Sequence, residues 1–318
     1  MNELIYFFLP LTFCIIGVFL FNKISREKNF ALGADINKKE QNKTPEATGI
    51  VLLILLWIII LAMNYVNGIR TEMFYWVGII SVFCLIGFAD DTVTKWTNKG
   101  LGWKQRAIPI ALFSVVFGLL ISGNIIEGTL IGLFIAAFSS FHNTFAGLNG
   151  WEVGSSYIIA LCTVFLLAGS GLFIYAVIVS ALILGLLLFN LYPAKVFPGD
   201  SGTLFMGSAI AGLIALTTKK ELIIVYVFFY LPHLVDFLFL KMLTNPKDPT
   251  QLKIRPYKLL ENGKLDIPEY KGKTKYDFAK LIIKIFGPMK EWKIVLINWL
   301  VVGINCLIWL IVFGKISF

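Results

Sequence analysis

The sequence predicts an all-α integral membrane protein, a bundle of about ten transmembrane helices with polar loops gathered at the cytoplasmic end. Hydrophobic residues make up 58% of the 318 positions, charged residues only 15%, and the mean hydropathy is +0.80. Too few polar side chains remain to cover the surface of a soluble domain. No internal repeat or low-complexity tract divides the chain, so we expect one polytopic domain over residues 1–318.

Ten apolar runs approach the length of about 20 residues that a membrane-spanning helix needs. In chain order they are Ile5–Phe21, Gly49–Tyr65, Met73–Phe88, Ile108–Ile121, Ile125–Phe141, Tyr157–Ala168, Leu172–Phe189, Leu204–Leu216, Leu222–Leu240 and Ile294–Phe313. The first run lacks a basic leader and a small-residue cleavage site, so we expect a retained helix rather than a signal peptide. The break at 169–171 that separates the sixth and seventh runs is the weakest division.

The basic residues give the bundle an orientation. Given ten spans, 24 of the 28 lysines and arginines fall in loops on one side of the membrane, and the exceptions are Arg70, Lys219, Lys220 and Lys315. By the positive-inside rule the crowded side is cytoplasmic. The same rule accounts for the net charge of +9, which therefore does not indicate a nucleic-acid partner.

Cysteine and histidine usage limits the chemistry. Cys14, Cys84, Cys162 and Cys306 lie within apolar runs, where they act as small buried hydrophobes rather than as disulfide or metal-binding residues. The chain has only two histidines, which argues against reactions that need several imidazoles. One of them, His233, follows Pro232 in the ninth run, and it either lines a groove with Asp236 or pairs within the bundle.

The sequence FPGDSG places Asp200 between glycines at the mouth of an apolar run. A carboxylate at a membrane boundary, on backbone that a phosphate or a hydrated cation can approach closely, is a candidate site. The alternative is a polar turn with Asp200 or Ser201 as the N-cap of a helix. Since all five cytoplasmic loops carry unusual polar residues, their convergence on one face favours the site.

Asp90 and Asp91 form a second acidic signal at the end of the third run. Adjacent carboxylates repel each other unless a cation or a basic group compensates their charge. They could bind Mg²⁺, accept a proton, or position Lys95 and Lys99. The alternative is a solvated helix end that these lysines neutralise, although carboxylates are disfavoured at a helix C-terminus.

The loop FHNTFAGLNGWEVG adds two amides, Asn143 and Asn149, and glycines that include Gly147. Amide oxygens coordinate hard cations, and amide groups can hydrogen-bond a nucleobase. Glycines allow close approach of the backbone to a ligand. Such a loop is usually a turn, but beside two acidic motifs it indicates a binding site.

Lys253, Arg255 and Lys258 make a basic cluster around Pro256 in the last cytoplasmic loop. Basic residues at a lipid surface commonly meet anionic headgroups. An arginine fork is also suited to a diphosphate. The sequence leaves both interpretations open.

Residues 274–289 predict a helix that lies in the membrane interface. Phe278, Leu281, Ile282 and Ile285 share one face of this helix, with lysines beside them. An apolar face flanked by lysines is typical of an interfacial helix. We expect its role to be structural.

Taken with these loops, the chain resembles the polyprenyl-phosphate N-acetylhexosamine-1-phosphate transferases, and among them the branch that makes GlcNAc-diphospho-dolichol. The motifs that carry the resemblance are DINK and PEATG (residues 35–49), GFADD (87–91), AGLNGWEVG (146–154), FPGD (197–200), GKLD (263–266) and GPMKE (287–291). The resemblance implies ten transmembrane helices, a homodimer, and transfer of a sugar-1-phosphate from UDP-GlcNAc or a related UDP-HexNAc to a polyprenyl or dolichyl phosphate, with release of UMP.

The resemblance also implies a metal and phosphate site. Asn143 and Asp200 correspond to the ligands of a required Mg²⁺, with Mn²⁺ as an alternative. Lys99 corresponds to a phosphate-binding lysine. Its spacing from Asp91 is one residue shorter than in the eukaryotic members, which leaves Lys95 as a rival.

For the nucleotide, the resemblance makes Phe197 the aromatic that stacks on uracil. Asn149 and the backbone of Ile36 hydrogen-bond the base, and Gly147 and Glu46 contact the ribose.

Two departures from the family pattern narrow the expectation. The triple-histidine motif of the muramoyl-pentapeptide branch is absent, which argues against that donor. The Arg-His-Arg sequence of the eukaryotic branch is replaced by Lys253, Ile254 and Arg255. The loop is also shorter, which favours a prokaryotic protein, archaeal and in the plasma membrane, over one of the endoplasmic reticulum.

The expected reaction is attack of the acceptor phosphate on the β-phosphorus of the UDP-sugar. Asp90 or Asp91 would remove a residual proton or steer the acceptor, and a double displacement through an aspartyl intermediate is the alternative. A transporter or flippase that uses the acidic loops as an ion relay is the competing function. Transporter acids, however, tend to lie near the middle of the membrane on broken helices. The longer aspartate-rich motif of the CDP-alcohol phosphatidyltransferases is absent.

Overall fold

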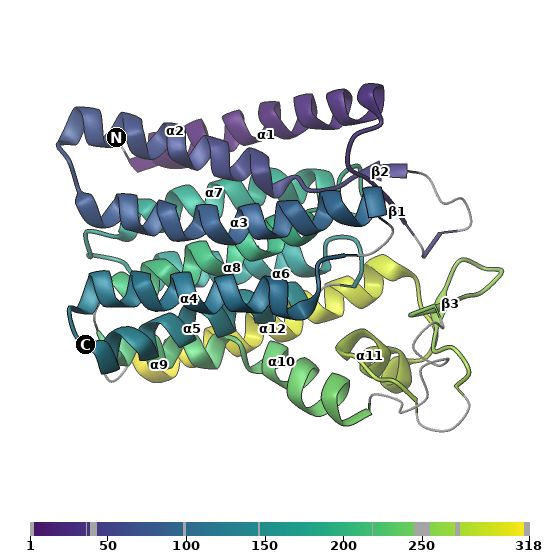
Figure 1. Ribbon diagram of the computed structural model, residues 1–318. Coiled ribbons are helices and arrows are strands. Elements are labelled where there is room, and N and C mark those ends of the chain that lie inside the picture. Colours follow the sequence, from purple (N-terminus) through teal and green to yellow (C-terminus); the bar gives the residue numbers. More distant parts are fainter. Residues whose placement is uncertain are drawn as a thin grey trace.

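The computed structural model describes residues 3–35, 37–38, 43–97, 100–145, 147–217, 219–244, 255–270 and 274–314, without the side chains of residues 3 and 94–97. Its helices are α1 Glu3–Lys28, α2 Gly49–Asn67, α3 Thr71–Thr97, α4 Trp103–Ser122, α5 Ile125–Thr144, α6 Trp151–Leu166, α7 Phe173–Asn190, α8 Gly199–Leu216, α9 Lys220–Phe229, α10 Leu231–Leu234, the π-helix η1 Val235–Met242, α11 Phe278–Phe286 and α12 Glu291–Gly314. The long helices lie side by side, and four short strands with α11 lie at one end of the bundle (Figure 1).

The prediction of an all-α membrane protein is confirmed. Within the described residues, eight helices are long and apolar enough to span a membrane. A ninth span is broken: α9 and the segment 231–242 meet at an angle of 57°, where Pro232 removes a backbone donor. The sixth predicted run forms α6, which has only 16 residues. The break at 169–171 does separate α6 from α7.

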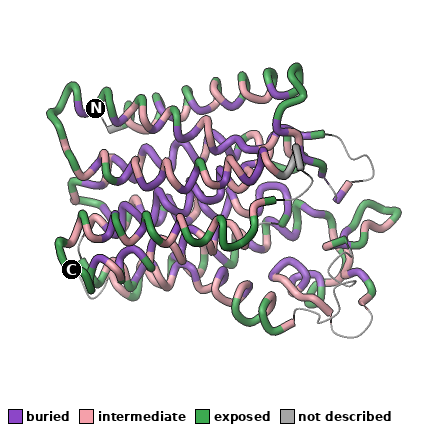
Figure 2. The backbone as a smooth tube through the Cα atoms, viewed as in Figure 1, coloured by how far each residue is buried: buried purple, intermediate pink, exposed green. Residues whose placement is uncertain are grey.

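Helix α8 forms the centre of the bundle. Every residue from Ser201 to Ala215 is buried, and the backbone tube is buried in the middle and exposed on the outer helices (Figure 2). Close packing against α3 depends on Gly87, because a Cβ at that position would clash with the backbone of Asp200. This approach brings the acidic end of α3 against the first turn of α8.

The outer helices present apolar side chains to their surroundings. Large hydrophobic residues on α1 and α4, among them Phe8, Phe19 and Leu112, are about half exposed. Such a surface would be unstable in water and is suited to lipid. The four cysteines are all buried and free, as expected.

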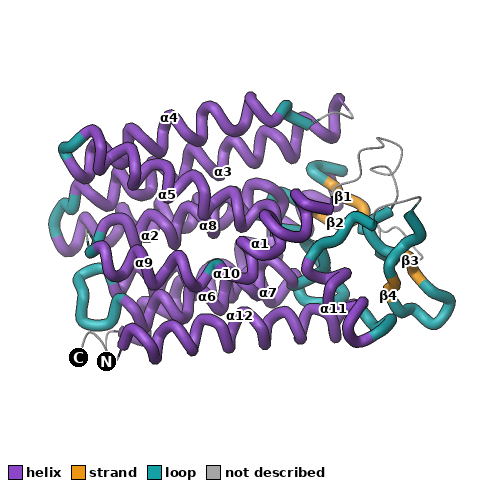
Figure 3. Tube along the Cα trace, turned by 90° about the horizontal axis from the view of Figure 1, so that it is seen from below, coloured by secondary structure: helices purple, strands orange, loops and turns teal. Residues whose placement is uncertain are grey.

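The strands and α11 form a small polar layer at one end of the helices, where they gather in the view of Figure 3. Strand β1 (Leu32–Ala34) pairs antiparallel with β2 (Lys43–Pro45), and β3 (Lys258–Leu259) pairs with β4 (Leu265–Asp266). A bridge from Leu265 to Met289 joins the second pair to the segment before α12. The loops that carry the predicted site therefore rest on hydrogen-bonded backbone.

Helix α11 differs from its predicted form. Its buried face includes Lys280, which pairs with Asp277 at 3.0 Å and lies over the rings of Tyr257 and Tyr270. Ile285, at the other end of the predicted apolar face, is exposed, as expected of a side chain that faces lipid. The lysine is buried because an acidic and two aromatic partners compensate the loss of water.

The two polar residues of the broken span, His233 and Asp236, are buried within the bundle. His233 packs on Phe145 with ring centroids 3.9 Å apart. Asp236 accepts a hydrogen bond from the backbone N–H of Phe278 at 2.7 Å and forms an ion pair with Lys241 at 2.7 Å. The structure supports internal pairing for Asp236, whereas the buried Nδ1 of His233 has no hydrogen-bond partner among the described residues.

Candidate active site

A cavity of about 220 Å³ opens at the polar end of the bundle. Its lining comes from three separate loops and the helix ends beside them, and consists of Ala34, Asp35, Asn37, Glu46, Asn143, Gly147, Leu148, Asn149, Glu152, Asn190, Phe197, Pro198, Gly199, Asp200 and Thr203. Six of the predicted site residues are among them. Three of the five loops that were predicted to converge therefore meet at this cavity.

Phe197 and Glu46 form one wall of the cavity. The backbone N–H of Phe197 donates to the carbonyl of Pro45 at 2.7 Å, and its carbonyl accepts from the Thr48 hydroxyl at 2.7 Å. A Cβ on Gly33 would lie 2.7 Å from Glu46 Oε2 and 3.3 Å from Phe197 Cδ2. Glycine at position 33 therefore lets this carboxylate and this ring lie over the same strand.

Asn149, which also lines the cavity, is held by two acidic side chains. Its backbone N–H donates to Glu291 Oε1 at 2.7 Å, and its side-chain Nδ2 donates to Asp35 Oδ2 at 2.9 Å. Asp35 also pairs with Lys38 at 2.7 Å. Asp35 belongs to the cavity but was not predicted as a site residue, although it lies within the DINK motif.

The FPGD and GLNG loops are joined by the side chain of Asn190. Its Oδ1 accepts from the N–H of Gly150 at 3.0 Å, and its Nδ2 donates to the carbonyl of Val196 at 2.9 Å. Gly150 has a φ of +83°, a conformation that favours glycine. Asn190 ends α7 and was also missed, because a lone asparagine after an apolar run reads as an ordinary helix end.

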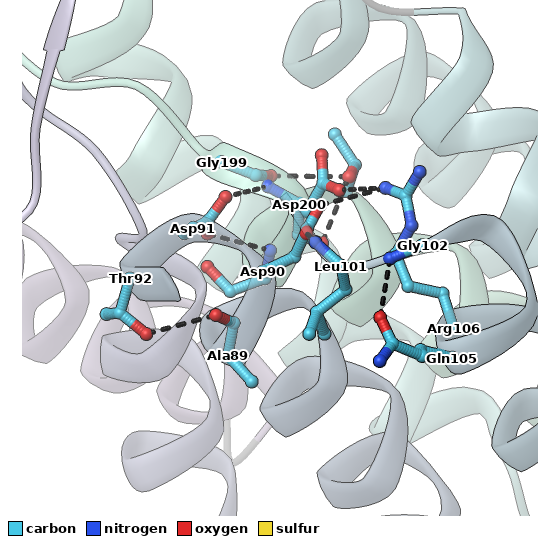
Figure 4. Close-up of polar contacts among 12 residues, drawn as sticks. Ala89, Asp90, Asp91, Thr92, Leu101, Gly102, Gln105, Arg106, Gly199 and Asp200 are labelled. Atoms are coloured by element: carbon cyan, nitrogen blue, oxygen red, sulfur yellow. Dashed lines mark hydrogen bonds and ion pairs between the residues drawn. The ribbon is translucent and has the colours of Figure 1, made fainter. Parts of the chain in front are cut away.

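Asp90 and Asp200 share one cation, the side chain of Arg106 in the first turn of α4. Arg106 Nη1 lies 2.9 Å from Asp90 Oδ2 and 2.7 Å from Asp200 Oδ2, and Figure 4 shows the guanidinium reaching both carboxylates. Asp90 also accepts a hydrogen bond from the backbone N–H of Leu101. The charges of Asp90 and Asp200 are thus offset by an arginine of the neighbouring helix.

Asp91, unlike Asp90, contacts the backbone at the start of α8. Its carboxylate accepts hydrogen bonds from the backbone N–H groups of Asp200 and Ser201, at 2.8 and 3.1 Å. These are orphan donors in the first turn of α8, and an anion at this position also complements the helix dipole. A side chain from α3 therefore caps α8, and Gly199 makes room for it, because a Cβ there would clash with Asp91 Oδ2.

Two expectations about the acidic motifs need correction. Neither Asp200 nor Ser201 is the N-cap of α8, which is Pro198. Asp90 and Asp91 do not end their helix either, because α3 continues to Thr97. Helix α3 continues because the pair is compensated by Arg106 and by the N-terminus of α8 rather than by the dipole of its own helix.

Asn143 and Asp200 provide oxygen atoms for a hard cation. Both residues line the cavity. One carboxylate and one amide, with phosphate and water completing the shell, suit the preference of Mg²⁺ for oxygen ligands. Among the described residues there is no cluster of three or more His, Cys, Asp or Glu side chains arranged around a metal.

The remaining predicted residues are placed less directly. Ile36, Lys99 and Lys253 lie outside the described residues, and so does the side chain of Lys95. Arg255 is exposed and does not line the cavity. Sequence reasoning missed Arg106 because it was counted only among the cytoplasmic cations, two residues before a proline-containing apolar run.

Comparison with known proteins gives the site its chemical context. The model of glycosyl transferase family 4 matches residues 73–218, which include the acidic pair, Asn143, Asn149 and Asp200. A protein of Methanocaldococcus jannaschii, provisionally named a glycosyltransferase, is 34% identical over 86% of this chain and 85% of its own length.

Two further relatives have more specific names. A protein of Sulfolobus acidocaldarius, provisionally named UDP-N-acetylglucosamine–dolichyl-phosphate N-acetylglucosaminephosphotransferase, is 30% identical over 84% of this chain and 83% of its own length. The phospho-N-acetylmuramoyl-pentapeptide-transferase of Shouchella clausii is 33% identical over 60% of this chain and 66% of its own length. With matches of this extent, the chain belongs to glycosyl transferase family 4, in the superfamily of polyprenyl-phosphate N-acetylhexosamine-1-phosphate transferases.

Proposed function

We propose that the protein transfers GlcNAc-1-phosphate, or a related HexNAc-1-phosphate, from a UDP-sugar to a polyprenyl or dolichyl phosphate and releases UMP. The observation that carries the proposal is the cavity itself. It joins an Asn143–Asp200 pair suited to a metal and a diphosphate with a wall, formed by Phe197 and Glu46, that is suited to a nucleoside.

The nucleoside half of the cavity combines stacking with polar recognition. The Phe197 ring offers a face to the base, and stacking of a base on an aromatic ring contributes about 1–3 kcal/mol. Asn149 offers an amide to the base edge, and the Glu46 carboxylate is available to ribose hydroxyls. Gly147 leaves the backbone open on the same side.

The diphosphate half contains Asp200 and Asn143, and Arg106 lies behind it, 2.7 Å from the Asp200 carboxylate. Mg²⁺, with Mn²⁺ as the alternative, would be held by the oxygens of Asn143 and Asp200, and when bound it neutralises phosphate charge. Arg106 adds a fixed cation, and its planar guanidinium suits phosphate oxygens. We assign it a phosphate-binding role alongside Lys99 and Arg255.

The reaction is an in-line phosphoryl transfer. An oxygen of the acceptor phosphate forms a bond to the β-phosphorus, the bond from that phosphorus to the bridging oxygen breaks, and UMP leaves with the electron pair. A phosphate monoester has its second pKa near 6, so no strong base is needed. Asp90 and Asp91 both stay candidates to take a residual proton, because Asp91 accepts from two backbone N–H groups and Asp90 is held by Arg106 and by the N–H of Leu101.

The acceptor lipid would reach the site from the membrane near the bend between α9 and α10, where Pro232 turns the span. Its phosphate would then lie beside α3 and α8. Since Asp90, Asp91 and Asp200 gather at one end of the bundle, their placement supports a surface enzyme rather than a transporter. We place this end in the cytoplasm because most basic residues lie there. A homodimer stays an expectation.

The direct test is an assay of the purified protein with radiolabelled UDP-GlcNAc, polyprenyl phosphate and Mg²⁺. Formation of a lipid-linked sugar together with UMP, resolved by thin-layer chromatography, is the expected result. UDP-GalNAc and UDP-MurNAc-pentapeptide run in parallel identify the sugar. Failure to transfer from every UDP-sugar tried would refute the proposal.

A further inference from the structure

We propose that Asp35 makes the nucleoside pocket selective for uracil over cytosine by fixing the orientation of the Asn149 side-chain amide. The inference rests on the proposed function, because it takes the base of a nucleotide to lie against Asn149. It adds a role for a residue that would not itself touch the substrate.

The contacts of Asp35 determine which atom of the Asn149 side-chain amide faces its carboxylate. Asp35 Oδ1 accepts from the backbone N–H of Asn37 at 3.2 Å, and Oδ2 pairs with Lys38 Nζ at 2.7 Å. Its carboxylate, paired with an ammonium group, only accepts hydrogen bonds. The nitrogen of the Asn149 amide must therefore face Asp35, and Nδ2 does so at 2.9 Å.

The position of Asn149 is fixed by its backbone as well. Its N–H donates to Glu291 Oε1 at 2.7 Å, and the residue is only 6% exposed although it lines the cavity. Among the residues that the structure describes, none donates a hydrogen bond to Asn149 Oδ1. An oriented acceptor and the second N–H of the same amide are therefore available to a ligand.

This arrangement matches one pyrimidine better than the other. Uracil presents the N3–H donor next to a carbonyl acceptor, so it can pair with the amide oxygen and the amide N–H together. Cytosine presents an N3 acceptor next to an amino donor, which requires the amide turned by 180°. Turning it would place Oδ1 against the Asp35 carboxylate, two acceptors facing each other in a buried site.

The expected selectivity follows from the value of a two-bond contact. A bidentate pair contributes about 1–3 kcal/mol of discrimination against the wrong base. At about 1.4 kcal/mol for each factor of ten, this is a preference of about 5- to 140-fold. Removing the acceptor at position 35 should release the amide and reduce the preference.

The experiment measures dissociation constants of UMP and CMP by calorimetry, with the full chain purified in detergent and Mg²⁺ present. The wild type should bind UMP more tightly by the factor above. In Asp35→Asn the ratio should fall to about one or reverse, because the new amide can keep the bond from Asn37 and turn its own N–H toward Asn149. Asp35→Ala, which leaves no acceptor, should also lower the ratio.

Glu291→Gln is the matched control, since it keeps the acceptor for the backbone of Asn149 and leaves the side-chain amide paired with Asp35. Its ratio should stay at the wild-type value. A second probe needs no variant: N3-methyl-UMP lacks the N3–H donor and should bind the wild type at least about five times more weakly than UMP.

The possible results distinguish a failure of the role of Asp35 from a failure of uridine recognition. If the wild type prefers UMP but both Asp35 variants keep that preference, or if N3-methyl-UMP binds as well as UMP, the role of Asp35 is refuted and the uridine site stands. If the wild type binds neither nucleotide, or binds both equally, the proposed uridine recognition fails, and this inference fails with it.

Discussion

The carboxylate of Asp91, a residue of α3, accepts a hydrogen bond of 2.8 Å from the backbone N–H of Asp200 at the start of α8. The two residues are 109 positions apart in the chain. One aspartate thus caps the helix on which the other is presented to the cavity. The stability of the bundle and the position of the candidate metal ligand depend on the same contact.

Asp91→Ala should lower both stability and activity. The variant leaves the N–H groups of Asp200 and Ser201 without acceptors, at a cost of about 1–3 kcal/mol. Asp91→Asn keeps one oxygen acceptor and should be milder. Thermal unfolding in detergent and turnover measure the two effects, with Glu127→Ala, an exposed carboxylate on α5, as the control. Equal unfolding temperatures for Asp91→Ala and the control would contradict the capping role.

Asp200→Ala and Asn143→Ala should each abolish Mg²⁺-dependent turnover. We expect a loss of at least about 100-fold, similar to the loss of a transition-state charge partner. The fold should persist, because both side chains lie at the cavity rather than in the packed interior. Turnover measured across a Mg²⁺ titration, with size-exclusion chromatography to monitor folding, tests this. Wild-type activity in either purified variant would remove that residue from the metal site.

Arg106→Met should impair catalysis more than Arg106→Lys. The methionine leaves the carboxylates of Asp90 and Asp200 facing each other without a cation, whereas a lysine restores one charge but not the fork. We expect turnover to fall by about 10- to 100-fold in the methionine variant, in line with loss of a charge-assisted hydrogen bond. The KM for the UDP-sugar should rise as well.

Lys104→Met is the matched control for Arg106. Lys104 lies two residues earlier on α4 and extends over the Trp103 ring instead of toward the acidic pair. Its turnover should stay near the wild-type value. If both methionine variants lose activity equally, the effect belongs to the charge of α4 and not to the contact with Asp200.

Phe197→Ala should raise the KM for the UDP-sugar. Loss of a stacking partner is expected to weaken nucleotide binding by about 1–3 kcal/mol, or about 5- to 140-fold. Phe197→Tyr retains the ring face and should behave nearly as the wild type. Binding of UMP by calorimetry separates this effect from catalysis. Unchanged UMP affinity in the alanine variant would place the base elsewhere.

Gly87→Ala should separate α3 from α8. A methyl group there would clash with the backbone of Asp200, and overpacking of this kind costs about 1–3 kcal/mol. Gly78→Ala, in the same helix, meets no atom within 4 Å and should stabilise α3 slightly. The unfolding temperature should therefore fall in Gly87→Ala and rise slightly in Gly78→Ala. Activity should fall only in Gly87→Ala. A lower unfolding temperature for Gly78→Ala would show that the helix tolerates no substitution at either glycine.

Sequence patterns predicted the spans well because hydropathy is a property of each segment alone. Pro232 predicted the bend of the ninth span, which the structure has. The short break of small residues at 169–171 separates α6 from α7, as expected. Glu46, Asn143, Asn149, Phe197 and Asp200 were expected to meet, and they do. Local chemistry and the family motifs were sufficient for these residues.

Contacts between distant helices could not be predicted in the same way. In the sequence, Arg106 is one of many cytoplasmic cations, and its contact with Asp90 and Asp200 depends on the packing of α4 beside α3. Likewise, Lys280 has the pattern of an interfacial lysine, and its burial depends on aromatic partners from another segment. Asp35 was visible in a motif, but its bond to Asn149 joins residues 114 positions apart. Pairing of this kind depends on the tertiary arrangement and not on the pattern of any one loop.

The complete burial of α8 has a consequence for how the protein meets membranes of different thickness. A bilayer that is too thick or too thin is accommodated by tilting of helices that touch lipid. Since α8 is surrounded by protein along its length, such adjustments would fall on outer helices such as α1 and α4. The position of the Asp200 carboxylate, at the start of α8, should therefore depend little on the thickness of the surrounding bilayer.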